Sequence, residues 1–205
     1  MKHHDYLKLI PAQQSGREIE AESNVNFDNI DAASIFYEKV KERLLDVNNW
    51  HKFAGIVSAK FQVVGADGKE VINKVEKGYY LRIDIPGPGS KAGDGYDWVF
   101  VEELIEKNEQ GIQSIGFRVR PSENPLGNPD ETAHFYSPES TSSFILTREE
   151  TQVYTWIVDR NIKSNQNAAS ITDKVRDSAI GAGALGIFSK IQWQGLADGL
   201  LKQEN

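Results

Sequence analysis

Residues 170–200, SITDKVRDSAIGAGALGIFSKIQWQGLADGL, decide the fold, because they predict one long helix near the end of the chain. An apolar or small residue recurs every three or four positions throughout this stretch, which is the spacing of one helical face. Ser170, with Asp173 three residues later, provides a suitable start signal. At about 1.5 Å per residue, a helix of about 30 residues is about 45 Å long and reaches across an entire sheet.

The residues before this helix predict a strand, a helix and then a series of antiparallel strands. Residues 17–27 alternate between polar and apolar side chains, as a half-buried strand does. Residues 28–31 supply helix-capping side chains, and apolar residues then recur at helical spacing until about Asn48 and Asn49. Further strands are expected over residues 57–63, 79–85, 98–105, 112–120, 144–148 and 152–159. The pattern predicts an α+β fold with about six or seven strands.

The composition is that of an ordinary globular protein and excludes several functions. The 205 residues include 30 acidic and 23 basic side chains, and the net charge of −7 argues against nucleic-acid binding. The chain has no cysteine, which excludes disulfides, thiolate zinc sites and cysteine nucleophiles. No apolar run approaches the roughly 20 residues that cross a bilayer, so we expect no stable membrane insertion. The first residues lack the apolar core of a secretory signal, and we expect a cytoplasmic protein.

The chain divides into an arm, one domain and a short tail. Residues 1–16 have little periodicity and predict a flexible amino-terminal arm. Residues 17–201 are expected to form a single domain, followed by a tail of residues 202–205. Two long loops interrupt the strands, from Pro86 to Tyr96 and from Pro121 to Ser140, because their prolines and glycines prevent regular strand pairing.

This order of elements resembles the helix-grip fold of the START-related (SRPBCC) superfamily, which includes lipid-transfer, pollen-allergen and polyketide-cyclase-like proteins. Residues 46–53, DVNNWHKF, are similar to the family's habit of ending its first helical segment with an acidic residue, a polar turn and a tryptophan. The resemblance covers about residues 17–201. It implies a curved antiparallel sheet wrapped around the last helix, with an elongated apolar cavity between them. The subfamily stays open, because residues 64–78 contain only three glycines where the allergen-like branch has a glycine-rich loop.

Residues 181–186, GAGALG, match the dinucleotide-binding fingerprint, but their context does not. That motif follows a strand and opens a helix, whereas residues 172–180 already have helical periodicity. We therefore expect no dinucleotide cofactor, and no other cofactor is indicated. Each glycine weakens a helix by about 1 kcal/mol relative to alanine. Three explanations remain open: close contact with the sheet, a kink, or room for a ligand beneath the helix.

A ligand beneath the helix would contact apolar and aromatic side chains of the strands, although a solid core would use the same residues. The predicted ligand-binding residues are Phe61, Leu81, Phe100, Glu102, Phe117, Arg118, Phe144, Trp156, Gly183 and Ile187. The sequence does not reveal which strand face lines the cavity.

Glu102 and Glu103 are adjacent in a predicted strand, so their side chains point to opposite faces. One of them therefore falls on a largely apolar face unless a bulge intervenes. Arg118 and Arg120 share a face of the next predicted strand and are suitable partners. The group is either an ion pair on the solvent face or a polar anchor inside the cavity. An anchor would hold a ligand head group or act as an acid.

No catalytic or metal-binding residue is predicted. His51 and His134 lack the histidine or carboxylate spacing of a metal site. Serines are abundant over residues 137–143, but the chain contains no GxSxG nucleophile motif.

Three functions follow from these patterns, and the first is the leading hypothesis. It is a binding protein for a lipid-like or aromatic small molecule, with access through the two long loops. The second is a cyclase- or dehydratase-like enzyme on the same fold, which would use Glu102 or Glu103 with Arg118. The third is a protein-interaction domain with a filled core, whose acidic loop from Glu123 to Glu139 meets a basic partner. The oligomeric state is not predicted.

Overall fold

The computed structural model describes residues 3–55, 59–85, 92–127, 131–165 and 181–203, with the side chains of its last helix described from Ser189 onward. The elements in chain order are β1 (Arg17–Asn26), α1 (Ile30–Leu45), the 3-10 helix η1 (Val47–Lys52), β2 (Lys60–Val64), β3 (Tyr80–Asp84), β4 (Asp97–Glu109), β5 (Ile112–Pro121), β6 (Thr141–Glu149), β7 (Gln152–Ile162) and α3 (Gly181–Leu200).

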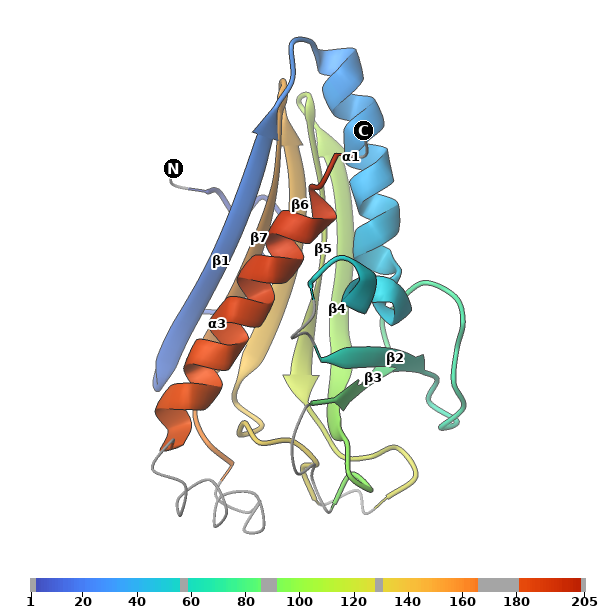
Figure 1. Cartoon of the computed structure of the whole chain (residues 1–205), viewed down its shortest axis with the longest axis vertical. Coiled ribbons are helices and arrows are strands. Elements are labelled where there is room, and N and C mark those ends of the chain that lie inside the picture. The colour runs from blue at the N-terminus through green and yellow to red at the C-terminus, as the bar shows by residue number, and fades with distance from the viewer. Residues whose placement is uncertain (1–2, 56–58, 86–91, 128–130, 166–180, 204–205) are drawn as a thin grey trace.

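The seven strands form one antiparallel sheet in the order β1-β7-β6-β5-β4-β3-β2. The first strand therefore pairs with the last, and β2 lies at the opposite edge. Both α1 and α3 pack on the concave face of the curved sheet (Figure 1). This arrangement confirms the predicted α+β helix-grip fold. No helix in the described ranges is both long and apolar enough to cross a membrane.

The helix α1 ends earlier than its apolar spacing predicts, at Leu45 instead of near residues 48 and 49. The Asn29 side chain caps its start by accepting a hydrogen bond from the Ala32 amide. At the other end, the Asn48 side chain bonds to β2, accepting from the Val63 amide over 2.7 Å. Because this asparagine is held by the sheet edge, the chain leaves the α-helix and continues as η1.

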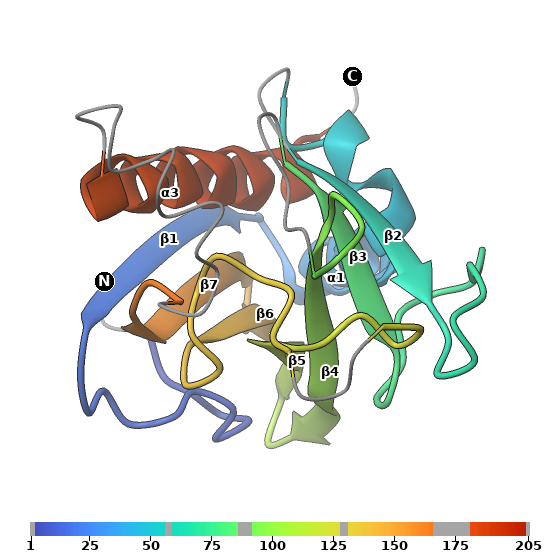
Figure 2. The ribbon, with the colours of Figure 1, turned by 90° about the horizontal axis from the view of Figure 1, so that it is seen from below.

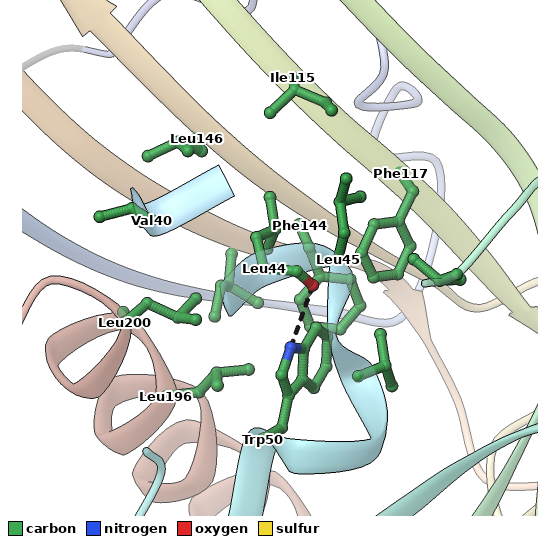
Figure 3. Close-up of a cluster of buried hydrophobic side chains, with 14 of the residues drawn as sticks. Val40, Leu44, Leu45, Trp50, Ile115, Phe117, Phe144, Leu146, Leu196 and Leu200 are labelled. Carbon is green, nitrogen blue, oxygen red and sulfur yellow. Dashed lines mark hydrogen bonds between the residues drawn. The ribbon is translucent and has the colours of Figure 1, made fainter. Parts of the chain in front are cut away.

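Trp50 of η1 lies at the centre of the core (Figure 3). Its indole Nε1 donates to the Leu44 carbonyl over 3.1 Å, so its polar atom is satisfied although the side chain is buried. Its ring lies 4.9 Å from that of Phe144 and 5.9 Å from that of Phe117. Leu196 and Leu200 of α3 belong to the same cluster, so the tryptophan joins both helices to the sheet.

Two glycines allow α3 to approach the chain after η1 very closely. A Cβ on Gly199 would lie 2.0 Å from the Phe53 carbonyl oxygen, and one on Gly195 would lie 2.6 Å from that of Ala54. The guanidinium of Arg43 also donates to the Leu200 carbonyl over 2.8 Å, satisfying a group left free at the helix end. The predicted helical turns over residues 170–180 lie outside the described residues.

The amino-terminal arm lies along the convex face of the sheet, opposite α3 (Figure 2). Leu7 and Leu9 are buried there against Ile145. Both leucines come within 3.0 Å of where a Cβ on Gly116 would be, so this glycine makes room for them. The arm has no periodic pattern in the sequence because a few separate side chains hold it.

Candidate functional site

A pocket of about 50 Å³ lies between the concave face of the sheet and α3. Its apolar lining residues are Ala59, Phe61, Leu81, Ile83, Ile85, Val99, Val119, Phe135, Phe144 and Trp193. Its polar lining residues are His134, Tyr136, Ser142, Ser189 and Gln192. A cavity that binds benzene has a volume of about 150 Å³. The side chains must therefore move apart before the pocket admits a whole aromatic ring.

The segment of residues 131–137, here called the strap, supplies three of these lining residues. It belongs to the second long loop, shown in yellow at the end of the sheet in Figure 1. The Trp98 amide donates to the Ala133 carbonyl over 2.8 Å, and the Asn165 amide donates to that of Phe135 over 2.8 Å. The backbone of the strap is thus fixed to β4 on one side and to the chain after β7 on the other.

The strap and α3 meet through two buried hydroxyl groups. The hydroxyl oxygens of Tyr136 and Ser189 lie 3.0 Å apart, and either group can be the donor. Burial raises the pKa of Tyr136 to about 12, although the hydrogen bond to Ser189 opposes the shift. Tyr136 is therefore neutral and protonated near pH 7.

His134 is a neutral histidine within the pocket wall. Burial lowers its pKa to about 3. Its Nδ1 accepts a hydrogen bond from the Tyr136 amide over 2.9 Å, so the single ring proton is on Nε2.

Two buried carboxyl groups contact residues of the pocket without lining it. Burial raises the pKa of Asp159 to about 6, against hydrogen bonds from Ser142 and Trp193, and the Trp193 indole donates to it over 2.9 Å. Burial likewise raises the pKa of Asp97 to about 7, against a hydrogen bond of 3.1 Å from the Phe135 amide. Among the described residues, no group of three or more histidine, aspartate or glutamate side chains could hold a metal ion.

Three of the predicted ligand-binding residues, Phe61, Leu81 and Phe144, line the pocket. Phe117 is buried beside it, with its ring 5.1 Å from that of Phe144. The surroundings of Gly183 and the side chain of Ile187 lie outside the described part of the chain. The strip of small residues over 178–184 also lies outside the described part, except that the backbone is helical from Gly181 onward.

The other four predicted residues, Phe100, Glu102, Arg118 and Trp156, lie away from the pocket. Phe100 pairs in register with Tyr80 and Arg120, on the face opposite Val99. Trp156 packs against the cluster of Leu7, Leu9 and Ile145 beneath the arm.

Glu102 forms the predicted ionic group with the arginines, and this group lies outside the pocket, next to the amino-terminal arm. The Arg118 guanidinium donates to its carboxylate over 2.8 Å and also to the Leu9 carbonyl of the arm. Partial burial raises the pKa of Glu102, but hydrogen bonds from Arg120 and Arg118 outweigh it and hold the pKa below its usual value. The strand register shifts between Val101 and the next paired residue, so a bulge releases the acid from the apolar face.

Sequence reasoning missed His134, Tyr136 and Gln192 as pocket residues. The first two lie in a proline-containing loop, where no periodicity indicates which side chains point inward. Gln192 is a polar residue next to Trp193, whose helical spacing does mark the buried face of α3.

Comparison with solved structures supports the assignment of the fold. A hypothetical protein of Helicobacter pylori has a similar structure, with a TM-score of 0.51 and 16% identity over 96% of this chain and 95% of that chain. Weaker similarities include a Thermus thermophilus protein, with a TM-score of 0.43 and 11% identity over 90% of this chain and 97% of that one. Norcoclaurine synthase of Thalictrum flavum has a TM-score of 0.36, with 11% identity over 90% of this chain and 94% of that one. No family model and no curated protein matches the sequence.

Proposed function

We propose that this chain is a member of the START-related superfamily and binds a small apolar or aromatic molecule between the sheet and α3. The observation that carries the proposal is the pocket, whose lining is mostly aliphatic and aromatic. Such a lining, with a few polar groups, is typical of small-molecule sites. Other hollows on the described surface contain charged side chains, among them Glu42 and Lys74 in one and Arg17 and Lys163 in another.

The driving force for binding would be burial of the ligand's apolar surface. An aromatic ring that buries about 150 Å² gains about 4 kcal/mol at 25 cal/mol per Å². Association and the opening of the pocket oppose this gain. Single-ring compounds are therefore expected to bind weakly, and larger ligands that fill an opened pocket more tightly.

Binding is favoured over catalysis by the titratable groups in the pocket wall. His134 and Tyr136 have pKa values of about 3 and about 12, so neither exchanges a proton readily near pH 7. The enzyme hypothesis uses Glu102 or Glu103 with Arg118, but neither acid lines the pocket. Glu102 pairs with Arg118 on the convex face beneath the arm, and Glu103 pairs with Lys77 over 3.0 Å. A cyclase-like activity would need a different acid.

The test is native mass spectrometry of the freshly purified protein, before and after addition of fatty acids and single-ring aromatic compounds. Ala59 lines the pocket, whereas Ala12 is exposed on the arm, so Ala59→Val and Ala12→Val form a matched pair. We expect one small molecule per chain in the wild type and in Ala12→Val, and a large loss of binding in Ala59→Val. Equal binding by all three proteins, or no binding by any of them, would overturn the proposal and favour a filled interaction domain.

A further inference from the structure

The polar groups of the pocket have more hydrogen-bond donors than the protein uses. His134, Tyr136, Ser189 and Gln192 are each more than nine-tenths buried, and all four line the pocket. The Nε2–H of neutral His134 has no acceptor among the described residues. Gln192 uses its amide oxygen, which accepts from the Ala59 amide over 3.4 Å, while its amide nitrogen has no acceptor within the same ranges.

The hydroxyl pair adds one more uncommitted donor. Tyr136 and Ser189 share a single hydrogen bond, so only one of their two hydroxyl hydrogens is used. Within the described part of the chain, neither hydroxyl has another partner. Because these donors belong to residues that line the pocket and no described acceptor takes them, this wall is complementary to a group that accepts hydrogen bonds.

The charges around the pocket decide whether that acceptor is ionised. None of the described lining residues is a lysine or an arginine, and His134 is neutral. The buried carboxyl groups of Asp159 and Asp97 do not line the pocket but accept hydrogen bonds from Trp193 and Phe135. A carboxylate ligand would lose its hydration and find no counter-ion, and an ammonium group, which only donates hydrogen bonds, would meet donors that lack acceptors.

We infer that the pocket takes a neutral molecule with an apolar or single-ring body and a carbonyl group, such as a ketone, an aldehyde or an ester. Its carbonyl oxygen accepts a hydrogen bond from the Tyr136–Ser189 hydroxyl pair, and its body contacts the aliphatic side chains of β3, β4 and β5. This inference rests on the proposed function and specifies the ligand class for the same pocket. It separates that class from fatty acids and from amines.

Four probes of similar size test the inference: acetophenone, which is a neutral ketone, cumene, which is its apolar counterpart, benzoate and benzylamine. Their dissociation constants are measured by NMR titration at pH 7. We expect acetophenone and cumene to bind in the pocket and benzoate and benzylamine to bind at least tenfold more weakly than acetophenone. Benzoate or benzylamine binding as tightly as acetophenone would overturn the inference, and this comparison needs no variant.

The hydroxyl pair is tested with the double variant Tyr136→Phe, Ser189→Ala, because either hydroxyl alone could still donate to a carbonyl. The ratio of the acetophenone constant to the cumene constant should rise about three- to tenfold. The matched control is Tyr37→Phe with Ser143→Ala, which removes two buried hydroxyls outside the pocket and should leave the ratio unchanged.

An unchanged ratio in a double variant that still binds cumene would overturn the inference and leave the proposed function standing. If the wild-type protein binds neither cumene nor acetophenone, the proposed function and the inference both fail.

Discussion

Filling the pocket from Ala59 is expected to stabilise the protein while it removes ligand binding. Valine adds two methyl groups to a side chain that lines about 50 Å³ of empty space. At about 24 cal/mol per Å³ of cavity, filling this space contributes up to about 1.2 kcal/mol to the free energy of unfolding. Urea unfolding at pH 7 and 25 °C measures the change, with an unchanged m-value as the sign that the denatured state is unaffected.

The exposed control, Ala12→Val, should change the free energy of unfolding by less than about 0.5 kcal/mol. If the core were already filled, overpacking would instead lower the free energy of unfolding by about 1–3 kcal/mol. A loss of 1 kcal/mol or more in Ala59→Val would therefore show that no space is available beside this residue, and the reasoning from the pocket would be refuted.

Three further substitutions test the fold and its buried charge. Gly199→Ala should lower the free energy of unfolding by about 2 kcal/mol or more, because its Cβ would meet the Phe53 carbonyl at 2.0 Å; stabilisation, as expected from helix propensity alone, would contradict the close packing. Leu9→Ala should cost about 2–4 kcal/mol, because this arm residue is fully buried; a change below about 0.5 kcal/mol would mean that the arm is detached. Asp159 has a raised pKa of about 6, so the folded state holds its proton more tightly, and this group contributes stability as the pH falls from about 7 to about 4. Asp159→Asn should remove that gain. The difference in the free energy of unfolding between the two proteins should be largest above pH 6 and shrink towards pH 4. A difference that does not vary with pH would contradict the burial of the charge.

The fold could be predicted from the sequence because its elements carry strong periodic signals. The alternation in β1 and the helical spacing in α1 and α3 place apolar residues on one face of each element. Trp50 is recognisable beside the polar turn that follows α1. The early end of α1 could not be predicted, since it depends on the Asn48 side chain reaching β2, a contact distant along the sequence.

The candidate site was only partly predictable. Phe61, Leu81 and Phe144 stand on apolar faces of alternating strands, so the pattern indicates that they are buried, but only the structure shows that their face lines the pocket. The placement of Glu102 depends on a bulge, which shifts the side-chain alternation without a glycine or proline to announce it. His134 and Tyr136 are positioned by the strap, whose conformation is set by tertiary hydrogen bonds rather than by local pattern.

Contacts between a bound probe and the concave face of the sheet would test the central claim most directly. With cumene bound, intermolecular nuclear Overhauser effects to the methyl groups of Leu81, Val99 and Val119 are expected, and they should disappear in Ala59→Val. Effects confined to Leu7 and Leu9 on the convex face, or an undiminished pattern in Ala59→Val, would contradict a ligand site between the sheet and α3.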